Sequence, residues 1–199
     1  MLRDIILNDV RVGKPVIIVD DSNREDEGDL VLAAERVDRW NLSFCMLHAR
    51  GLMCIPCTRE RLERLQVPMM PSNNLDPLQT PFSVSVDAVE GTTTGMSVFD
   101  RLKTIAVMVD DHSIPNQLSY PGHMFPLRAR DGLLKERQGH TESSVELVKL
   151  VGFKPVAVII ELMNSDGTMM RGSQLQDFAS MYNINIVAIQ EIHDAVYGV

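Results

Sequence analysis

Residues 15–34, PVIIVDDSNREDEGDLVLAA, join two apolar runs through a loop dense in carboxylates. The runs PVIIV (15–19) and LVLAA (30–34) each predict a short buried strand, because they are apolar and end at charged residues. Six carboxylates and one arginine stand at 20–29. Such a loop is either solvated surface or a set of oxygen ligands for a hard cation such as Mg²⁺. The loop alone leaves both interpretations open.

Strand and helix patterns alternate irregularly along the rest of the chain, with a Pro-, Asn- and Ser-rich loop at 68–81. Further strands are expected at 51–56, 82–88, 155–161 and 183–189, and helices at 41–49, 58–66, 97–109, 141–151 and 173–182. The run 82–88 alternates apolar and polar residues, which is typical of antiparallel strands with one exposed face. The patterns predict an α+β fold in which helices cover both faces of a mixed sheet, as one domain over residues 1–199.

Composition narrows the classes of function. The net charge of -8 over 199 residues argues against a nucleic-acid partner, which would need a basic face. Apolar runs fall far short of the ~18 residues of a membrane span, and the N-terminus lacks the apolar core of a signal peptide. Three cysteines do not indicate a disulfide framework. We expect a soluble cytoplasmic protein.

The stretch 137–142, RQGHTE, precedes an amphipathic helix. A glycine turn feeding a helix N-terminus offers free backbone N–H groups and the positive end of the helix dipole, which suit a phosphate. Arg137 adds a planar charged donor and Thr141 a hydroxyl, while His140 suits a metal ligand or an acid–base group. Simple helix capping by Thr141 or Ser143 is the alternative.

Two further residues are candidates for proton transfer. His123 is expected in a Pro-Gly-His turn just before a strand, although a single histidine is more often structural than catalytic. Glu161 ends the apolar run 155–160, where a carboxylate is costly unless it is paired or hydrogen-bonded. With the acidic loop and the phosphate-ready helix start, these residues suit metal-assisted enolisation of a sugar phosphate.

The pair Cys54 and Cys57 offers a competing interpretation. A C-x-x-C between a strand and a helix is the pattern of a dithiol redox centre in cytosolic proteins. A structural zinc site would need a second cysteine pair, and only Cys45 remains. The alternative is that both thiols pack as small apolar groups.

Five motifs stand in one order: DDSNREDEGD (20–29), EGTTTG (90–95), PGHMFPLR (121–128), RQGHTE (137–142), and Glu161 followed by NSDGTMMR (164–171). Together they closely resemble the 3,4-dihydroxy-2-butanone 4-phosphate synthase family of riboflavin biosynthesis, over about residues 5–198. The resemblance implies a three-layer sandwich and a homodimer. It also implies a lyase that converts D-ribulose 5-phosphate to 3,4-dihydroxy-2-butanone 4-phosphate and formate.

The resemblance also assigns roles to residues by their place in the matching motifs. Glu25 would ligate both of two Mg²⁺ (or Mn²⁺) ions and His140 one of them. His123 and Glu161 would be essential to catalysis. The residues implied to contact the substrate are Arg24, Glu25, Asp29, Arg137, Gln138, Gly139, His140, Thr141 and Glu161.

Several positions depart from the usual family pattern. Asp26 stands where Asn is usual, Tyr120 where Arg precedes Pro-Gly-His, and Val98-Phe99 where two small residues are usual. The Cys often seen before Glu161 is also absent. None of these changes touches Glu25, His123, His140 or Glu161, the positions assigned to metal binding and catalysis, so we expect them to affect substrate affinity more than reaction type.

Overall fold

The structure is a computed structural model that describes residues 2–70 and 77–198. The strands are β1 (Val16–Val19), β2 (Gly28–Ala33), β3 (Cys54–Cys57), β4 (Val86–Ala88), β5 (Leu118–Arg128), β6 (Ala157–Glu161) and β7 (Ile186–Ala188). The α-helices are α1 (Asp4–Arg11), α2 (Arg39–His48), α3 (Arg59–Arg64), α4 (Val98–Val109), α5 (His140–Leu150), α6 (Ser173–Tyr182) and α7 (Ile189–Tyr197). Short 3-10 helices lie at Ala34–Arg36, Pro115–Gln117 and Leu133–Lys135.

Within the described ranges the strands form one seven-stranded sheet in the order β4-β5-β3-β6-β2-β1-β7. β3 runs parallel to β5 and β1 parallel to β7, whereas the other neighbours are antiparallel. The predicted mixed sheet is therefore confirmed. The loop expected at 68–81 lies partly outside the described residues, because 71–76 are not among them.

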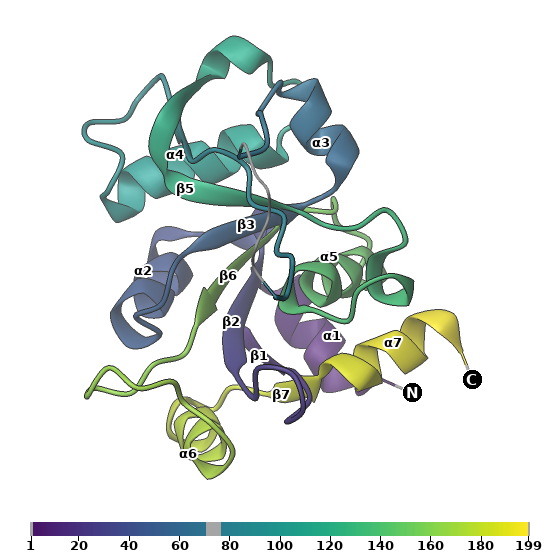
Figure 1. Cartoon of the computed structure of the whole chain (residues 1–199). Coiled ribbons are helices and arrows are strands. Elements are labelled where there is room, and N and C mark those ends of the chain that lie inside the picture. Colours follow the sequence, from purple (N-terminus) through teal and green to yellow (C-terminus); the bar gives the residue numbers. More distant parts are fainter. Residues whose placement is uncertain (1, 71–76, 199) are drawn as a thin grey trace.

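Helices cover both faces of the sheet, so the molecule has three layers (Figure 1). In the view of Figure 1, α2, α4 and α6 lie to the left of the sheet and α1, α5 and α7 to its right. Each face has its own apolar core: Leu42, Met108 and Phe178 belong to the first, and Ile6 and Leu147 to the second. Each fully buried Leu or Ile contributes roughly 1.5–3 kcal/mol by leaving water.

Two strand boundaries differ from the sequence expectation and matter for function. β2 begins at Gly28 rather than at 30, so Asp29 is a strand residue that pairs with Glu161 of β6. β5 already includes 121–123, which were expected to form a turn before a strand. Both extensions depend on pairing with strands distant in sequence, so local patterns did not reveal them. Helix α1 was also not predicted, although its Ile6 and Val10 are buried on one side.

Candidate active site

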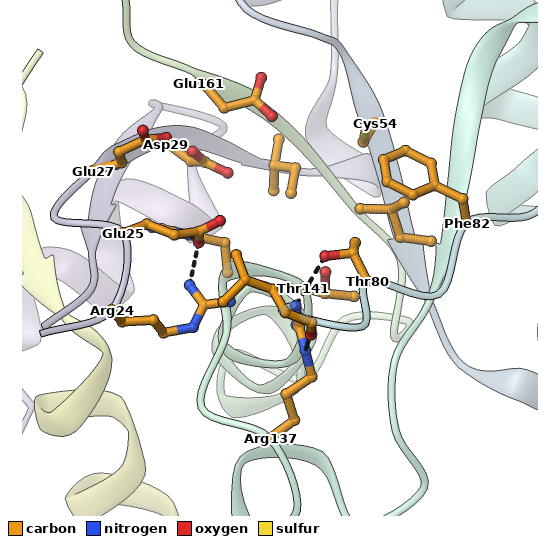
Figure 2. Close-up of a pocket in the computed structure, with 14 residues that line it drawn as sticks. Arg24, Glu25, Glu27, Asp29, Cys54, Thr80, Phe82, Arg137, Thr141 and Glu161 are labelled. Atoms are coloured by element: carbon orange, nitrogen blue, oxygen red, sulfur yellow. Dashed lines mark hydrogen bonds and ion pairs between the residues drawn. The ribbon is translucent and has the colours of Figure 1, made fainter. Parts of the chain in front are cut away.

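A pocket opens where β2 begins and β6 ends, beside the first turn of α5 (Figure 2). Its volume is about 210 Å³, which suits a small polar molecule. Figure 2 shows Glu161 and Asp29 on one side of this pocket, with Arg24 and Arg137 facing them across it. Most of the site residues expected from the sequence line it: Arg24, Glu25, Asp29, Arg137, His140, Thr141 and Glu161.

The acidic loop is organised by one of its own carboxylates, Asp20. Its oxygens accept the backbone N–H groups of Glu25 at 3.1 Å and Glu27 at 2.9 Å, and it forms an ion pair with Arg24 at 2.7 Å. Asp26 adopts a left-handed backbone with φ of 54°. Asp tolerates that conformation better than most residues, because its short polar side chain can form local hydrogen bonds. The loop is thus wound around Asp20, with Glu25 turned to the pocket.

Asp20, Glu25 and His140 place one donor atom each within 4.8 Å of one another, the only such group of three found among the described residues. The Glu25 carboxylate lies 3.6 Å from Nδ1 of His140. Among the described residues, two buried side-chain atoms have no hydrogen-bond partner: Nε2 of His140 and Oδ1 of Asp29. Buried polar atoms left unpaired cost about 1–3 kcal/mol each. Carboxylate oxygens and an imidazole are donors that suit a divalent cation, and these residues therefore fit one.

The charged groups in this cluster shift one another's pKa values. The neighbouring imidazole of His140 lowers the pKa of Glu25, against the effect of partial burial. Burial raises the pKa of Asp29 to about 7, although His140 opposes this. Burial of the imidazole opposes its protonation, but Asp29 and the neighbouring carboxylates outweigh that effect and raise the pKa of His140 to about 9. Clustered pKa shifts of this kind are typical of functional sites.

The first turn of α5 has the features of an anion site. Gly139 is the N-cap residue and no side chain caps the helix. A Cβ at 139 would overlap the guanidinium of Arg137, so the glycine allows that group to lie against the helix start. Arg137 is held by Glu142 at 2.6 Å, by the Thr80 hydroxyl at 3.1 Å and by a backbone carbonyl at 3.2 Å. The helix dipole and the guanidinium therefore act on the same space.

Strand register brings Glu161 and Asp29 together. Their Cα atoms are partners in the β2–β6 ladder, so both side chains project from the same face of the sheet. The backbone N–H of Leu52 donates to Oε2 of Glu161 at 2.7 Å, which satisfies part of that carboxylate. Two carboxylates on one face of the sheet, beside the helix start, give the pocket its acid–base capacity.

The two cysteines of the C-x-x-C do not form a dithiol centre. They lie on β3, where residues three apart face opposite sides, and they belong to different cores of the molecule. Burial raises the pKa of Cys57 to about 12, and burial together with Glu161 and Asp29 raises that of Cys54 still further. The packing interpretation therefore accounts for both thiols, and Cys54 forms part of the pocket wall.

Three of the expected site residues do not line the pocket: His123, Gln138 and Gly139, the last of which is the N-cap of α5. Among the described residues that line the pocket, His123 is absent; its Nδ1 lies 2.6 Å from Oδ2 of Asp87. Gln138 lines a neighbouring hollow on the outer side of the acidic loop. Sequence reasoning did not single out Asp20, Asp87 or Glu142, although each is an acid at a strand end or in a first helical turn, where such residues often bind or orient other groups.

A sequence model of the 3,4-dihydroxy-2-butanone 4-phosphate synthase family matches residues 4–195. The chain belongs to this family. A 3,4-dihydroxy-2-butanone 4-phosphate synthase from Photorhabdus laumondii is 42% identical over 186 residues, which cover 94% of this chain and 86% of that protein. The riboflavin biosynthesis protein RibBA of Aquifex aeolicus is 46% identical over 94% of this chain and 46% of its own length.

Solved structures agree with the sequence relatives. A crystal structure of 3,4-dihydroxy-2-butanone 4-phosphate synthase in complex with two magnesium ions superposes with a TM-score of 0.92 at 36% identity, covering 97% of this chain and 95% of that one. A cation-free form superposes with a TM-score of 0.89 at 34% identity, covering 98% and 96%. The chain is thus a lyase of riboflavin biosynthesis, as the resemblance implied. No helix in the described part of the chain is long and apolar enough to cross a membrane.

Proposed function

We propose that this pocket binds D-ribulose 5-phosphate and that its side chains carry out the conversion to 3,4-dihydroxy-2-butanone 4-phosphate and formate. The observation that carries the proposal is the meeting of three features in one pocket: the start of α5, the Glu25–His140 cluster and the Asp29–Glu161 pair. We take residues 1–199 as one domain for this reaction, in the cytoplasm.

The phosphate would lie at the start of α5. Backbone N–H groups of 139–141 and the Thr141 hydroxyl would donate to it, and the Arg137 guanidinium would complete the anion site. Gln138 would contact the phosphate from its outer side. Arg24, Glu25 and Asp29 face the pocket from the acidic loop and β2, where they can bind sugar hydroxyls.

Glu25 and His140 would hold the Mg²⁺ (or Mn²⁺), Glu25 contacting two ions and His140 one. The magnesium-bound relative supports this assignment, as do the unpaired Nε2 of His140 and the nearby Asp20 carboxylate. When bound, the metal would polarise the carbonyl and hydroxyl oxygens of the sugar. The Arg24–Glu25 ion pair orients the Glu25 carboxylate at the edge of the pocket.

Proton transfers are assigned to Glu161 and His123. The reaction requires proton abstraction next to a carbonyl, loss of water and a shift of the carbon skeleton, and the water lost returns when formate leaves. Glu161 projects into the pocket and is held by the Leu52 N–H, so its other carboxylate oxygen can take and return a proton at a sugar carbon.

His123 is not among the described residues that line the pocket, which supports a homodimer in which a second copy brings its His123 to the site. Exposed apolar side chains lie on or directly beside β5, which carries this histidine, and its neighbours β4 and α4: Tyr120 on β5 is 55% exposed, Val89 after β4 52% and Phe99 on α4 64%. Large exposed apolar side chains on neighbouring elements are typical of a surface that another chain covers. Copies of the same chain would then complete each other's sites.

Formate release tests the proposal. The purified protein is incubated with ribulose 5-phosphate and Mg²⁺, then with EDTA, and then as the Glu25→Gln variant; we expect formate only in the first case. If no divalent metal supports formate release, the proposed activity is wrong and the protein would be a non-catalytic sugar-phosphate-binding module. Full activity of Glu25→Gln would remove the metal assignment. Mixing inactive Glu161→Gln with inactive His123→Gln should restore part of the activity if sites are shared between copies.

A further inference from the structure

The carboxylate of Asp87 makes two contacts with a single residue. Its Oδ1 accepts the backbone N–H of His123 at 3.0 Å, and its Oδ2 lies 2.6 Å from Nδ1 of the same histidine. One contact fixes the backbone and the other fixes the plane of the ring. A carboxylate placed in this way fixes both the backbone position of the histidine and the orientation of its ring.

The backbone of β4 and β5 around Asp87 and Gly122 allows the Asp87–His123 contact to form. The β4–β5 register shifts between Val86 and Asp87, where β4 meets the Pro-Gly-His segment. A Cβ on Gly122 would overlap the backbone of both residues. Glycine therefore permits a close approach of the two strands. That approach brings the Asp87 carboxylate beside residue 123.

The EGTTTG turn closes over the pair. Gly95 has φ of 89°, and a Cβ there would overlap both Oδ2 of Asp87 and Nδ1 of His123. The turn is held by Asp100 of α4, which accepts the N–H and the hydroxyl of Thr93 at 2.9 and 2.8 Å and the N–H of Gly95 at 3.1 Å. The turn thus shields the Nδ1 side of the ring.

Exposure of the two side chains differs. The Asp87 side chain is 13% exposed, whereas that of His123 is 41% exposed, so the remainder of the ring faces outward. An ionised carboxylate can only accept hydrogen bonds, so Nδ1 must donate. A neutral imidazole then has Nε2 as its acceptor.

We propose that Asp87 is the positioning residue for His123, holding the neutral ring with its proton on Nδ1 so that Nε2 is free to accept a proton from the substrate. This inference rests on the proposed catalytic role of His123. It also gives the EGTTTG and Pro-Gly-His motifs a shared role. Both motifs surround the contact through which the Asp87 carboxylate keeps the proton of His123 on Nδ1.

Ring ¹⁵N NMR of uniformly labelled protein tests the tautomer directly. The His123 signals are identified by their loss in His123→Gln. We expect the neutral ring to show a protonated Nδ1 in the wild type and a shift toward the Nε2–H form in Asp87→Asn, because the amide can donate to Nδ1. A wild-type ring with its proton on Nε2 would overturn the proposal, even if Asp87→Asn failed to fold.

Kinetics test the consequence. We expect Asp87→Asn to lower kcat by about 10²–10⁴-fold with little change in KM, since a wrong tautomer removes proton transfer and Asp87 does not line the pocket. Asp131→Asn, which changes an exposed aspartate paired with Arg59, is the matched control and should match the wild type. If His123→Gln abolishes formate release while Asp87→Asn does not, the positioning role is wrong. If His123→Gln remains active, the proposed role of the histidine itself is wrong.

Discussion

Arg137 is placed to bind substrate, but its removal should also destabilise the protein. Its partner Glu142 is fully buried, and the two carboxylate oxygens accept the backbone N–H of Arg130 at 3.1 Å and the Arg137 guanidinium at 2.6 Å. Substitution Arg137→Ala leaves that carboxylate buried with a single neutral donor. Breaking a buried ion pair in this way costs about 3–5 kcal/mol. In a chain of this size the melting temperature should fall by about 6–20 °C.

Thermal and urea unfolding of four variants measures this effect. Arg59→Ala is the matched control, because Arg59 is 46% exposed and pairs with exposed Asp131 at 3.1 Å. Such a surface pair is worth about 1 kcal/mol or less. Glu142→Gln and the double variant Arg137→Ala/Glu142→Gln complete a cycle, in which the double variant should recover most of the stability lost by Arg137→Ala.

The double variant also separates stability from binding. It should be folded and yet have a raised KM for ribulose 5-phosphate, because the planar donor at the start of α5 is missing. The reasoning is refuted if Arg137→Ala loses no more stability than Arg59→Ala, or if the double variant is as unstable as the single one.

Three other predictions concern the remaining features of the pocket and its surroundings. Glu25→Gln should weaken Mn²⁺ or Mg²⁺ binding at least about 10–100-fold by titration calorimetry, whereas Asp26→Asn in the same loop, outside the ligand cluster, should retain the wild-type affinity. Iodoacetamide at pH 8 should leave Cys54 unmodified in the native protein and label it after unfolding, because burial raises the pKa of its thiol; rapid native labelling would contradict this. Hydrogen bonds from Thr93 hold the pKa of Asp100 at about 2, below its ordinary 3.8, so its stabilising contribution is present above about pH 4 and is lost as the pH falls from 4 to 2. The difference in free energy of unfolding between the wild type and Asp100→Asn, measured in urea, should therefore shrink as the pH falls over that range. A constant difference would show that ionised Asp100 does not stabilise the protein.

Much of the fold could be read from local patterns. The run 155–161 is apolar almost throughout because β6 lies in the middle of a sheet covered on both faces, and β6 indeed spans Ala157–Glu161. The helix expected at 173–182 has the same limits in the structure. Edge elements were less predictable: β4 covers only Val86–Ala88 of the strand expected at 82–88, because its limits depend on where β5 approaches it.

The candidate site was predictable in its chemistry but not in its arrangement. Acidic loop, helix start and strand-end carboxylate could each be named from residue type and position. Their meeting point could not, because the β2–β6 register that pairs Asp29 with Glu161 joins residues far apart in the chain. Nor could residue types reveal that Asp20 organises the loop or that Glu142 holds Arg137.

The sequence by itself determined the family, the class of reaction and the types of side chain available for metal binding and proton transfer. It could do so because the five motifs and their order contain the side chains that the reaction needs. Only the tertiary structure decided which of them act together. Pleating of β3 separated Cys54 from Cys57 onto opposite faces and removed the redox alternative. Long-range pairing placed Asp29 in a strand of the pocket and His123 against Asp87, apart from the pocket lining. Backbone hydrogen bonds between distant strands set these positions, and no local pattern encodes them.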